Sequence, residues 1–341
     1  MTSVSQFLPL TAAFADKVQK TMDVILHIGA QRTATTSFQA YLRANSAELN
    51  AQGIGYWGPH RTRRGGVFTA LTSIQDGVVP DGVVNRAVGE TREKIAKHIS
   101  FLQKRGTTHL IVSDENMLGT VRTNVRADCF YPYAAQRLDR FARVFEGIVT
   151  RIAISIRSFE TYWPSALAFS VGRSGRMPRA RALERIVTQP RGWSDVVSDV
   201  ATTFPGVDIL VDSHESYANR PELRLSHLLD GAIDPPLKHS RLWLNPSPDL
   251  AQLRASLTKH GRSVDMLPAG EGRWDPFNSE QSAKLREKYA DDLFWLYAGA
   301  DGLARFIEEK KPDQTGKNLS GGATTRGQDY DREDRRMART G

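Results

Sequence analysis

Residues 24–29 read VILHIG, residues 30–36 read AQRTATT, and residues 37–44 read SFQAYLRA. The first segment is short, apolar and rich in β-branched residues, which is typical of a buried parallel strand. The last segment carries Phe38 and Leu42 on one face, as an amphipathic helix does. The stretch therefore predicts a strand, a polar loop and a helix in immediate succession.

The same alternation of strands and helices continues along the chain. Three further segments have the apolar character of buried strands: His109–Ser113, Arg151–Ile156 and Asp208–Val211. Helical patterns fall between them at Ala87–Lys104 and Tyr133–Phe145. This order predicts βαβ units, and therefore an α/β fold with a central parallel sheet flanked by helices. Beyond residue 248 we predict helix, with an apolar stripe between residues 279 and 298.

Length and composition bound the organisation of the chain. Its 341 residues are 40% hydrophobic and 25% charged, which excludes a disordered, collagen-like or disulfide-scaffold protein. We expect residues 1–22 to be a weakly ordered lead, residues 23–312 to form the folded domain, and residues 313–341 to be a disordered tail. No apolar run is long enough to span a membrane, and the N-terminus lacks a signal-peptide pattern. We therefore expect a cytoplasmic protein with no transmembrane segment.

The net charge of the chain indicates which class of partner it binds. The formal net charge is +8, from 46 basic and 38 acidic residues, and a basic surplus favours anionic partners such as nucleotides or acidic sugars. A single cysteine, Cys129, cannot form an internal disulfide, and no cysteine–histidine cluster has zinc-site spacing. No RNA- or DNA-binding motif is recognisable, so we expect no nucleic-acid partner.

The loop between residues 29 and 37 is the strongest chemical signal. A loop that enters a helix N-terminus directs free N–H groups and the positive end of the helix dipole at one point, where phosphate or sulfate binds. The nucleoside-triphosphatase pattern G-x-x-x-x-G-K-[ST] is not met, because Ala34 and Thr35 stand where it needs glycine and lysine. The candidate binding residues are Gln31, Arg32, Thr33, Ala34, Thr35, Thr36 and Ser37.

Residues 27–39, HIGAQRTATTSFQ, resemble the 5′-phosphosulfate loop of sulfotransferases, which use 3′-phosphoadenosine 5′-phosphosulfate (PAPS). Arg32 stands where family members usually have lysine, and Ala34 where they usually have glycine. The family binds the 3′-phosphate with an arginine at a strand end and a serine eight residues later, which matches Arg157 and Ser165 here. The chain is most similar to the bacterial, carbohydrate-type members.

The resemblance implies a three-layer P-loop-like fold over residues 23–312, and transfer of a sulfuryl group from PAPS to a hydroxyl or amine. It implies a small-molecule or carbohydrate acceptor, anionic ones included, and no metal. Arg32 then has a purely electrostatic role, since arginine keeps its proton at physiological pH. Arg157 and Ser165 hold the 3′-phosphate.

A sulfuryl acceptor needs a general base. Glu115 is the first candidate, because it follows the strand at residues 109–112 and so sits at the carboxyl edge of the sheet beside the loop. His60, shortly after the first helix, is the second candidate, whereas His27 lies inside the first strand and is expected to be a core residue. The basic stretch at residues 61–64 is a candidate contact for an anionic acceptor.

Two other functions stay open on the sequence. One is a non-catalytic protein that binds a nucleotide or a polyanion, because Arg32 and Ala34 depart from the family loop. The other is a P-loop kinase, against which the missing loop lysine and the lack of a clear magnesium-binding carboxylate speak. No motif identifies the acceptor, the adenine-binding residues or the oligomeric state.

Overall fold

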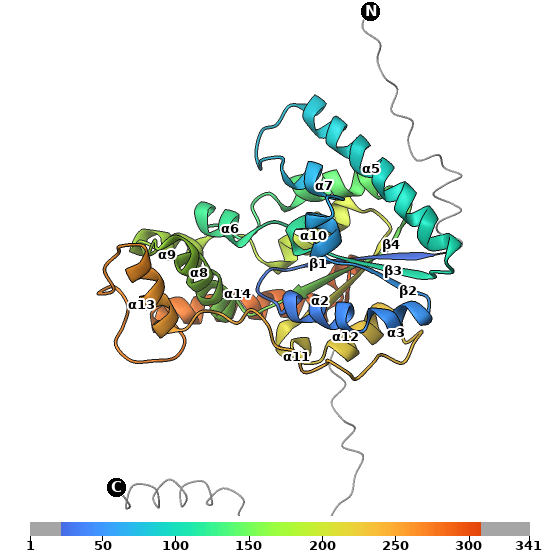
Figure 1. Cartoon of the computed structure of the whole chain (residues 1–341). Helices are drawn as coiled ribbons and strands as arrows, with labels where there is room; N and C mark the ends of the chain where they lie inside the picture. Colours follow the sequence, from blue (N-terminus) through green and yellow to red (C-terminus); the bar gives the residue numbers. More distant parts are fainter. Residues whose placement is uncertain (1–21, 308–341) are drawn as a thin grey trace, which may run out of the picture. The chain divides into compact units, whose positions relative to one another are not determined.

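A central parallel sheet organises the structure, a computed structural model that describes residues 22–307 (Figure 1). Its six strands lie in the order β2-β3-β1-β4-β5-β6, and every neighbouring pair is parallel. The strands are β1 (Asp23–Gly29), β2 (Ile54–Trp57), β3 (His109–Ser113), β4 (Val149–Ile156), β5 (Asp208–Ser213) and β6 (Arg305–Phe306). Central strand β1 is buried from its second residue onward, as its unbroken apolar run requires.

Helices cover both faces of this sheet (Figure 1), which confirms the predicted α/β class. One face carries α4 (Thr69–Thr72), α5 (Asp81–Lys104), α7 (Ala134–Val144) and α10 (Trp193–Thr203). The other carries α2 (Thr35–Ala44), α3 (Ser46–Ala51), α11 (His214–Tyr217) and α12 (Pro221–Leu228). A third group lies to one side: α6 (Val121–Ala127), α8 (Phe159–Ser174), α9 (Ala180–Thr188), α13 (Leu250–Lys259) and α14 (Ser279–Tyr297). Single turns are η1 (His60–Arg64), η2 (Glu115–Met117) and η3 (Ala300–Gly302).

Two hydrophobic cores sandwich the sheet, because successive side chains of a strand point to opposite faces. Val24 and Leu26 of β1 belong to the larger core, with α5, α7 and α10. Ile25, between them, belongs to the smaller core, where it meets Phe38 and Leu42 of α2. The apolar face predicted for residues 37–44 is thus the face that packs α2 on the sheet.

The observed elements differ from the predicted ones mainly at their ends. The bounds of β3 are those expected, whereas β4 begins two residues earlier and β5 ends two residues later. The sequence did not indicate β2 or β6, since β2 has only four residues, including Gly55, and β6 has two. The prediction of helix beyond residue 248 holds for α13 and α14, but residues 260–278 between them are not helical.

Residues 22–307 belong to one compact unit. The weakly ordered lead and the disordered tail were predicted for segments that, except for Met22, lie outside the described residues. Within residues 22–307, no helix combines the length and the apolarity needed to cross a membrane.

The parallel arrangement brings the carboxyl ends of four strands to one edge of the sheet. The segments that follow β1, β3, β4 and β5 begin at residues 30, 114, 157 and 214. β1 lies between β3 and β4, and the order of the chain through the sheet reverses there. Open α/β sheets bind their ligands at such a switch point.

A buried ion pair ties this edge to the helix layer beneath it. Asp212 of β5 accepts two hydrogen bonds of 2.8 Å from the Arg224 guanidinium of α12, and both side chains are almost fully buried. The same guanidinium lies 5.6 Å from the ring centre of Phe38 in α2. The pair therefore connects β5, α12 and the helix that carries the polar loop.

We predict that Asp212→Asn lowers the free energy of unfolding by about 3–5 kcal/mol, because it leaves the buried Arg224 charge uncompensated. Asp230→Asn is the matched control, since Asp230 pairs with Arg151 but is 62% exposed, and its loss should cost less than about 1 kcal/mol. Urea denaturation of both variants measures the difference. Equal destabilisation by the two substitutions would contradict this account.

Candidate functional site

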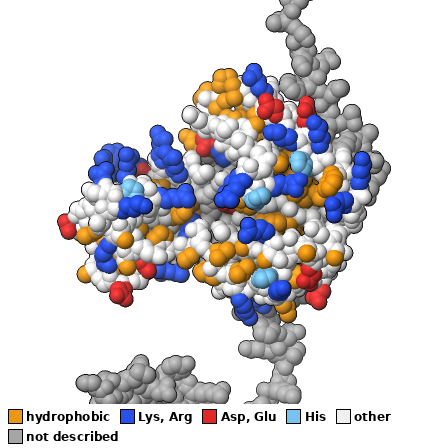
Figure 2. Space-filling view, in the orientation of Figure 1, with side chains coloured by type: hydrophobic (Ala, Val, Ile, Leu, Met, Phe, Trp, Pro, Cys, Tyr) orange, Lys and Arg blue, Asp and Glu red, His pale blue; other side chains and the backbone are white. Residues whose placement is uncertain are grey.

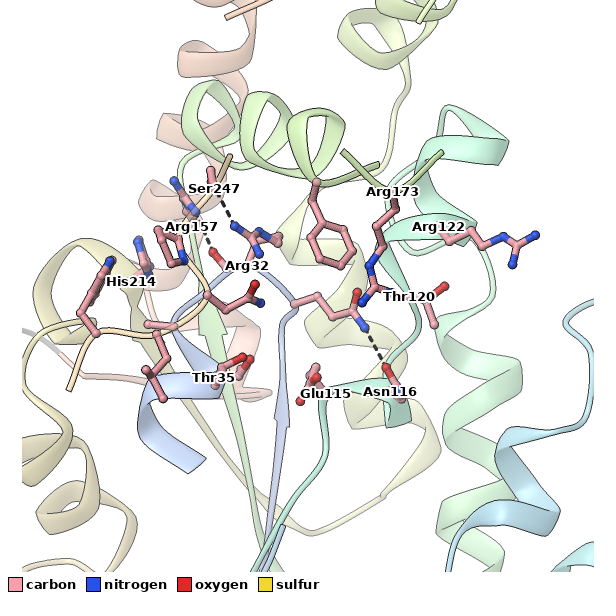
Figure 3. A pocket seen from close by; sticks show the side chains of 18 of the residues that line it. Arg32, Thr35, Glu115, Asn116, Thr120, Arg122, Arg157, Arg173, His214 and Ser247 are labelled. Atoms are coloured by element: carbon pink, nitrogen blue, oxygen red, sulfur yellow. Dashed lines mark hydrogen bonds between the residues drawn. The ribbon is translucent and has the colours of Figure 1, made fainter. Parts of the chain in front are cut away.

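A pocket of about 780 Å³ opens at the carboxyl edge of the sheet, within the usual range of small-molecule sites. Its floor is the loop after β1 and the start of α2, and its walls come from η2, α8 and the segment 243–247 (Figure 3). Loops after four different strands thus converge on one cavity.

The pocket is strongly basic. One carboxylate, Glu115, lines it, against six arginines: Arg32, Arg63, Arg122, Arg157, Arg173 and Arg273. Lys and Arg side chains also dominate the middle of the face seen in Figure 2, between the α8–α9 group and α2. This excess of positive charge in a concave site attracts anions.

The floor of the pocket is an uncapped helix N-terminus. Arg32 and Ala34 have left-handed backbone conformations, with φ of 67° and 64°, and no side chain caps α2 at Ala34. The first N–H groups of an α-helix have no partner within the helix. Thr35 and Thr36 line the pocket next to those groups. The structure therefore has the arrangement of N–H groups and hydroxyls that the sequence predicted for an anion site.

Two hydroxyls of the loop are used internally instead. Thr33 Oγ1 donates to the Ala30 carbonyl oxygen at 2.7 Å, and Ser37 Oγ accepts the Leu244 N–H at 2.8 Å. Both side chains are buried, and neither lines the pocket. Thr33 therefore braces the loop, and Ser37 fastens the segment that forms one wall.

Gln31 is held in place by three partners. Its N–H donates to the Tyr131 hydroxyl at 3.0 Å, its Nε2 donates to Asn116 Oδ1 at 2.7 Å, and its Oε1 accepts the Val121 N–H at 2.6 Å. Gln31 lines the pocket with its amide already engaged. It fixes the loop against η2 and α6.

Arg32 and Arg157, which the sequence assigned to two separate anion sites, lie together in the pocket (Figure 3), and Ser165 contacts Arg32 without lining the pocket. Arg32 Nε donates to Ser165 Oγ at 2.9 Å, and its Nη2 donates to Ser247 Oγ at 3.0 Å. Arg157 Nη1 donates to the Arg32 carbonyl oxygen at 2.7 Å, and its Nε donates to Thr161 Oγ1 at 2.9 Å. The loop after β1 and the arginine after β4 thus form one cluster.

Neither arginine of this cluster forms an ion pair with a carboxylate of the described residues; their partners are hydroxyls and a carbonyl. Burial, and then the charge of Arg32, lower the pKa of Arg157 to about 10. Burial also lowers the pKa of Arg32. Both groups are cationic at neutral pH, and their mutual repulsion falls when an anion lies beside them.

Glu115 lies where the sequence placed it, just after β3 and beside the loop. Its Oε1 is 2.8 Å from Arg63 Nη2, and its Oε2 accepts a hydrogen bond of 2.8 Å from Gln39 Nε2. Arg63 also pairs with the buried Asp114. A carboxylate oxygen has two acceptor sites, so Glu115 retains capacity for a further donor from the pocket.

The two histidines named from the sequence lie elsewhere. His60 begins η1 and does not line the pocket; it lines a second cavity beside it. His27 is a core residue, as expected: its Nδ1 is 2.7 Å from Ser113 Oγ, and burial lowers its pKa to about 3. His27 is therefore uncharged at neutral pH.

Some lining residues carried no signal in the sequence. Trp243 and Ser247 lie in a segment without regular structure, so no periodicity marks them. His214 could have been found, because it directly follows β5. Burial, followed by the charges of Arg157 and Arg224, lowers its pKa to about 3.

Comparisons of the chain with family models, curated proteins and solved structures give no match. Within residues 22–307, no group of three or more histidine, cysteine, aspartate or glutamate side chains is arranged to hold a metal ion.

We predict that Ala34→Gly stabilises the protein by about 0.5–1 kcal/mol, because a left-handed conformation costs an L-residue about 1–2 kcal/mol and glycine much less. Ala40→Gly, inside the α2 helix that Ala34 precedes, is the matched control and should destabilise by about 1 kcal/mol. Chemical denaturation compares the two. A loss of stability in Ala34→Gly would show that the loop conformation carries no strain.

Proposed function

We propose that this chain is a PAPS-dependent sulfotransferase that transfers a sulfuryl group to a hydroxyl or amine of a carbohydrate-like acceptor. The observation that carries the proposal is a pair of neighbouring arginines, the buried Arg157 and the half-buried Arg32. They are joined to each other and have no carboxylate partner among the described residues. Buried like charges in a pocket are compensated when a polyanion binds there.

The residues present fit the two anionic ends of PAPS. The N–H groups at the start of α2, with Thr35 and Thr36, suit the 5′-phosphosulfate, as helix N-termini suit phosphate. Arg157 lines the pocket and suits the 3′-phosphate, since an arginine fork matches phosphate oxygens in pairs. Ser165, the second residue predicted for this phosphate, does not line the pocket, and its hydroxyl is engaged by Arg32 and Ser247. The Phe169 and Trp243 side chains also line the pocket and offer aromatic surface for a base.

PAPS supplies the sulfuryl group when it is bound. The acceptor oxygen forms the new bond to sulfur, the bond from sulfur to the bridging oxygen breaks, and the electron pair of that bond stays with the departing 5′-phosphate. Arg32 contributes positive charge where this negative charge develops, which is an electrostatic role. The hydroxyl proton of the acceptor passes to the Glu115 carboxylate, and no oxidation state changes in the transfer.

One observation favours the second candidate, a non-catalytic polyanion-binding protein. Both oxygens of Glu115 already have partners, Arg63 and Gln39. If the chain is a non-catalytic binding protein, Glu115 holds the pocket wall through these two contacts and removes no proton from a ligand. The two candidates share a ligand class and differ in turnover.

We predict that 3′-phosphoadenosine 5′-phosphate (PAP) raises the melting temperature by about 5–10 °C at a hundredfold excess over its dissociation constant. ADP and ATP, which lack the 3′-phosphate, should raise it much less. Arg157→Ala should reduce the PAP shift to that of ADP, while the exposed Arg126→Ala should not. Equal shifts by PAP and ADP in the unmodified chain would overturn the proposal.

We predict that Glu115→Gln lowers turnover of radiolabelled PAPS with a panel of hydroxyl and amine acceptors by about 10²–10⁴. The base must be ionised, so activity of the unmodified chain falls at low pH and this acidic limb disappears in the variant. Glu90→Gln, at an exposed site of α5, is the control.

An acidic limb that persists in Glu115→Gln would remove Glu115 as the base. A full PAP shift with no turnover in the unmodified chain, whatever the acceptor, would establish the non-catalytic alternative instead.

A further inference from the structure

A second cavity of about 770 Å³ adjoins the pocket. The two cavities share Thr36, Arg63 and Leu244 in their linings. The second one is built from α2, β2 and η1, so it lies on the side of Glu115 away from Arg157. A ligand in it reaches the first pocket at the point where Arg63 holds the Glu115 carboxylate.

The charged lining of this second cavity is entirely basic among the described residues. It comprises Arg43, Arg61, Arg63 and Arg64, with His60 at the start of η1. Arg63 is already neutralised by Asp114 and Glu115. The positive charge that faces the cavity without compensation therefore comes from the other three arginines.

Among these three arginines, Arg61 gives the clearest case of a positive charge without a partner. It lies over the Trp57 ring at 5.3 Å, and its Nε is buried with no hydrogen-bond partner. No carboxylate of residues 22–307 pairs with it, and burial lowers its pKa. An oxyanion is the acceptor that matches a guanidinium best.

The cavity also has apolar surface. Ala40, Tyr56, Pro59 and Leu244 line it. The Tyr56 side chain folds over Gly58, where an added Cβ would come within 2.0 Å of the Tyr56 hydroxyl oxygen. Gly58 therefore leaves room for the Tyr56 side chain, which lines the cavity and offers aromatic surface to a sugar ring.

We propose that this cavity is the acceptor subsite, and that the acceptor is a sugar ring bearing its own oxyanion, either a carboxylate or a sulfate ester. The inference rests on the proposed function. Arg61 and Arg64 bind the oxyanion, Tyr56 packs against the ring, and a ring hydroxyl faces Glu115 at the junction of the two cavities.

The test is calorimetric binding of three probes to the full chain in the presence of PAP: 4-nitrophenyl β-D-glucuronide, the 6-sulfate of 4-nitrophenyl β-D-glucoside, and the neutral glucoside. We expect at least one anionic probe to bind about tenfold or more tightly than the neutral one, the gain of one charge-assisted contact. Whichever anion binds more tightly distinguishes carboxylate from sulfate ester. Arg61→Gln and Arg64→Gln should each reduce this preference.

The control variant is Arg105→Gln, because Arg105 also lies over an aromatic ring, 5.5 Å from that of Phe101, but lines neither cavity. It should keep the full preference. Arg61→Gln removes a side chain that packs on Trp57 and could disturb the fold. Arg64→Gln is therefore the second test variant, because Arg64 is exposed. Equal binding of all three probes, no binding of any, or a preference that survives in both Arg61→Gln and Arg64→Gln would overturn the inference.

The PAP melting shift separates this inference from the proposed function. A PAP shift without an anionic preference overturns the acceptor subsite and leaves the sulfotransferase proposal standing. An anionic preference without a PAP shift overturns the sulfotransferase proposal, and with it the acceptor role of the cavity.

Discussion

Two neighbouring positive charges, the buried Arg157 and the half-buried Arg32, constrain this site more than any other feature. Arg157 donates to the Arg32 carbonyl oxygen, and both guanidinium groups find only neutral partners. Such an arrangement lowers the stability of the ligand-free protein and raises its affinity for anions by the same physical cause. The basic pocket thus lowers the free energy of unfolding, and a bound anion restores it.

The rest of the structure holds those charges in position. β1 and β4 are neighbours, so the loop after one meets the arginine after the other. The buried Arg224–Asp212 pair links β5 to the helices that support the loop. Ser37 fastens the segment that brings Trp243 and Ser247 over the pocket. Together these contacts define where a ligand can bind.

Much of the fold was accessible from hydrophobic pattern alone. The apolar runs of β1, β3, β4 and β5 are long enough to be recognised, and alternation with helices implied the parallel sheet. β2 and β6 were missed because strands of four and two residues carry too little pattern. The positions of Gln31, Arg32, Thr35, Thr36 and Arg157 in the pocket followed from their places next to strand ends. His60 did not enter it, because η1 turns it toward the neighbouring cavity.

The sequence by itself determined which residues stand at the ends of strands and at the start of α2, because local periodicity sets the elements and parallel strands share one carboxyl edge. Only the tertiary structure decided that Thr33 and Ser37 turn inward, that Arg32 reaches Ser165, and that a second basic cavity adjoins the first. Thr33 turns inward through a local bond to Ala30, but the positions of Ser37 and Arg32 depend on contacts between segments more than a hundred residues apart, such as Arg32 with Ser247 and Ser37 with Leu244. No local pattern encodes such long-range contacts, since packing in three dimensions decides which segments meet.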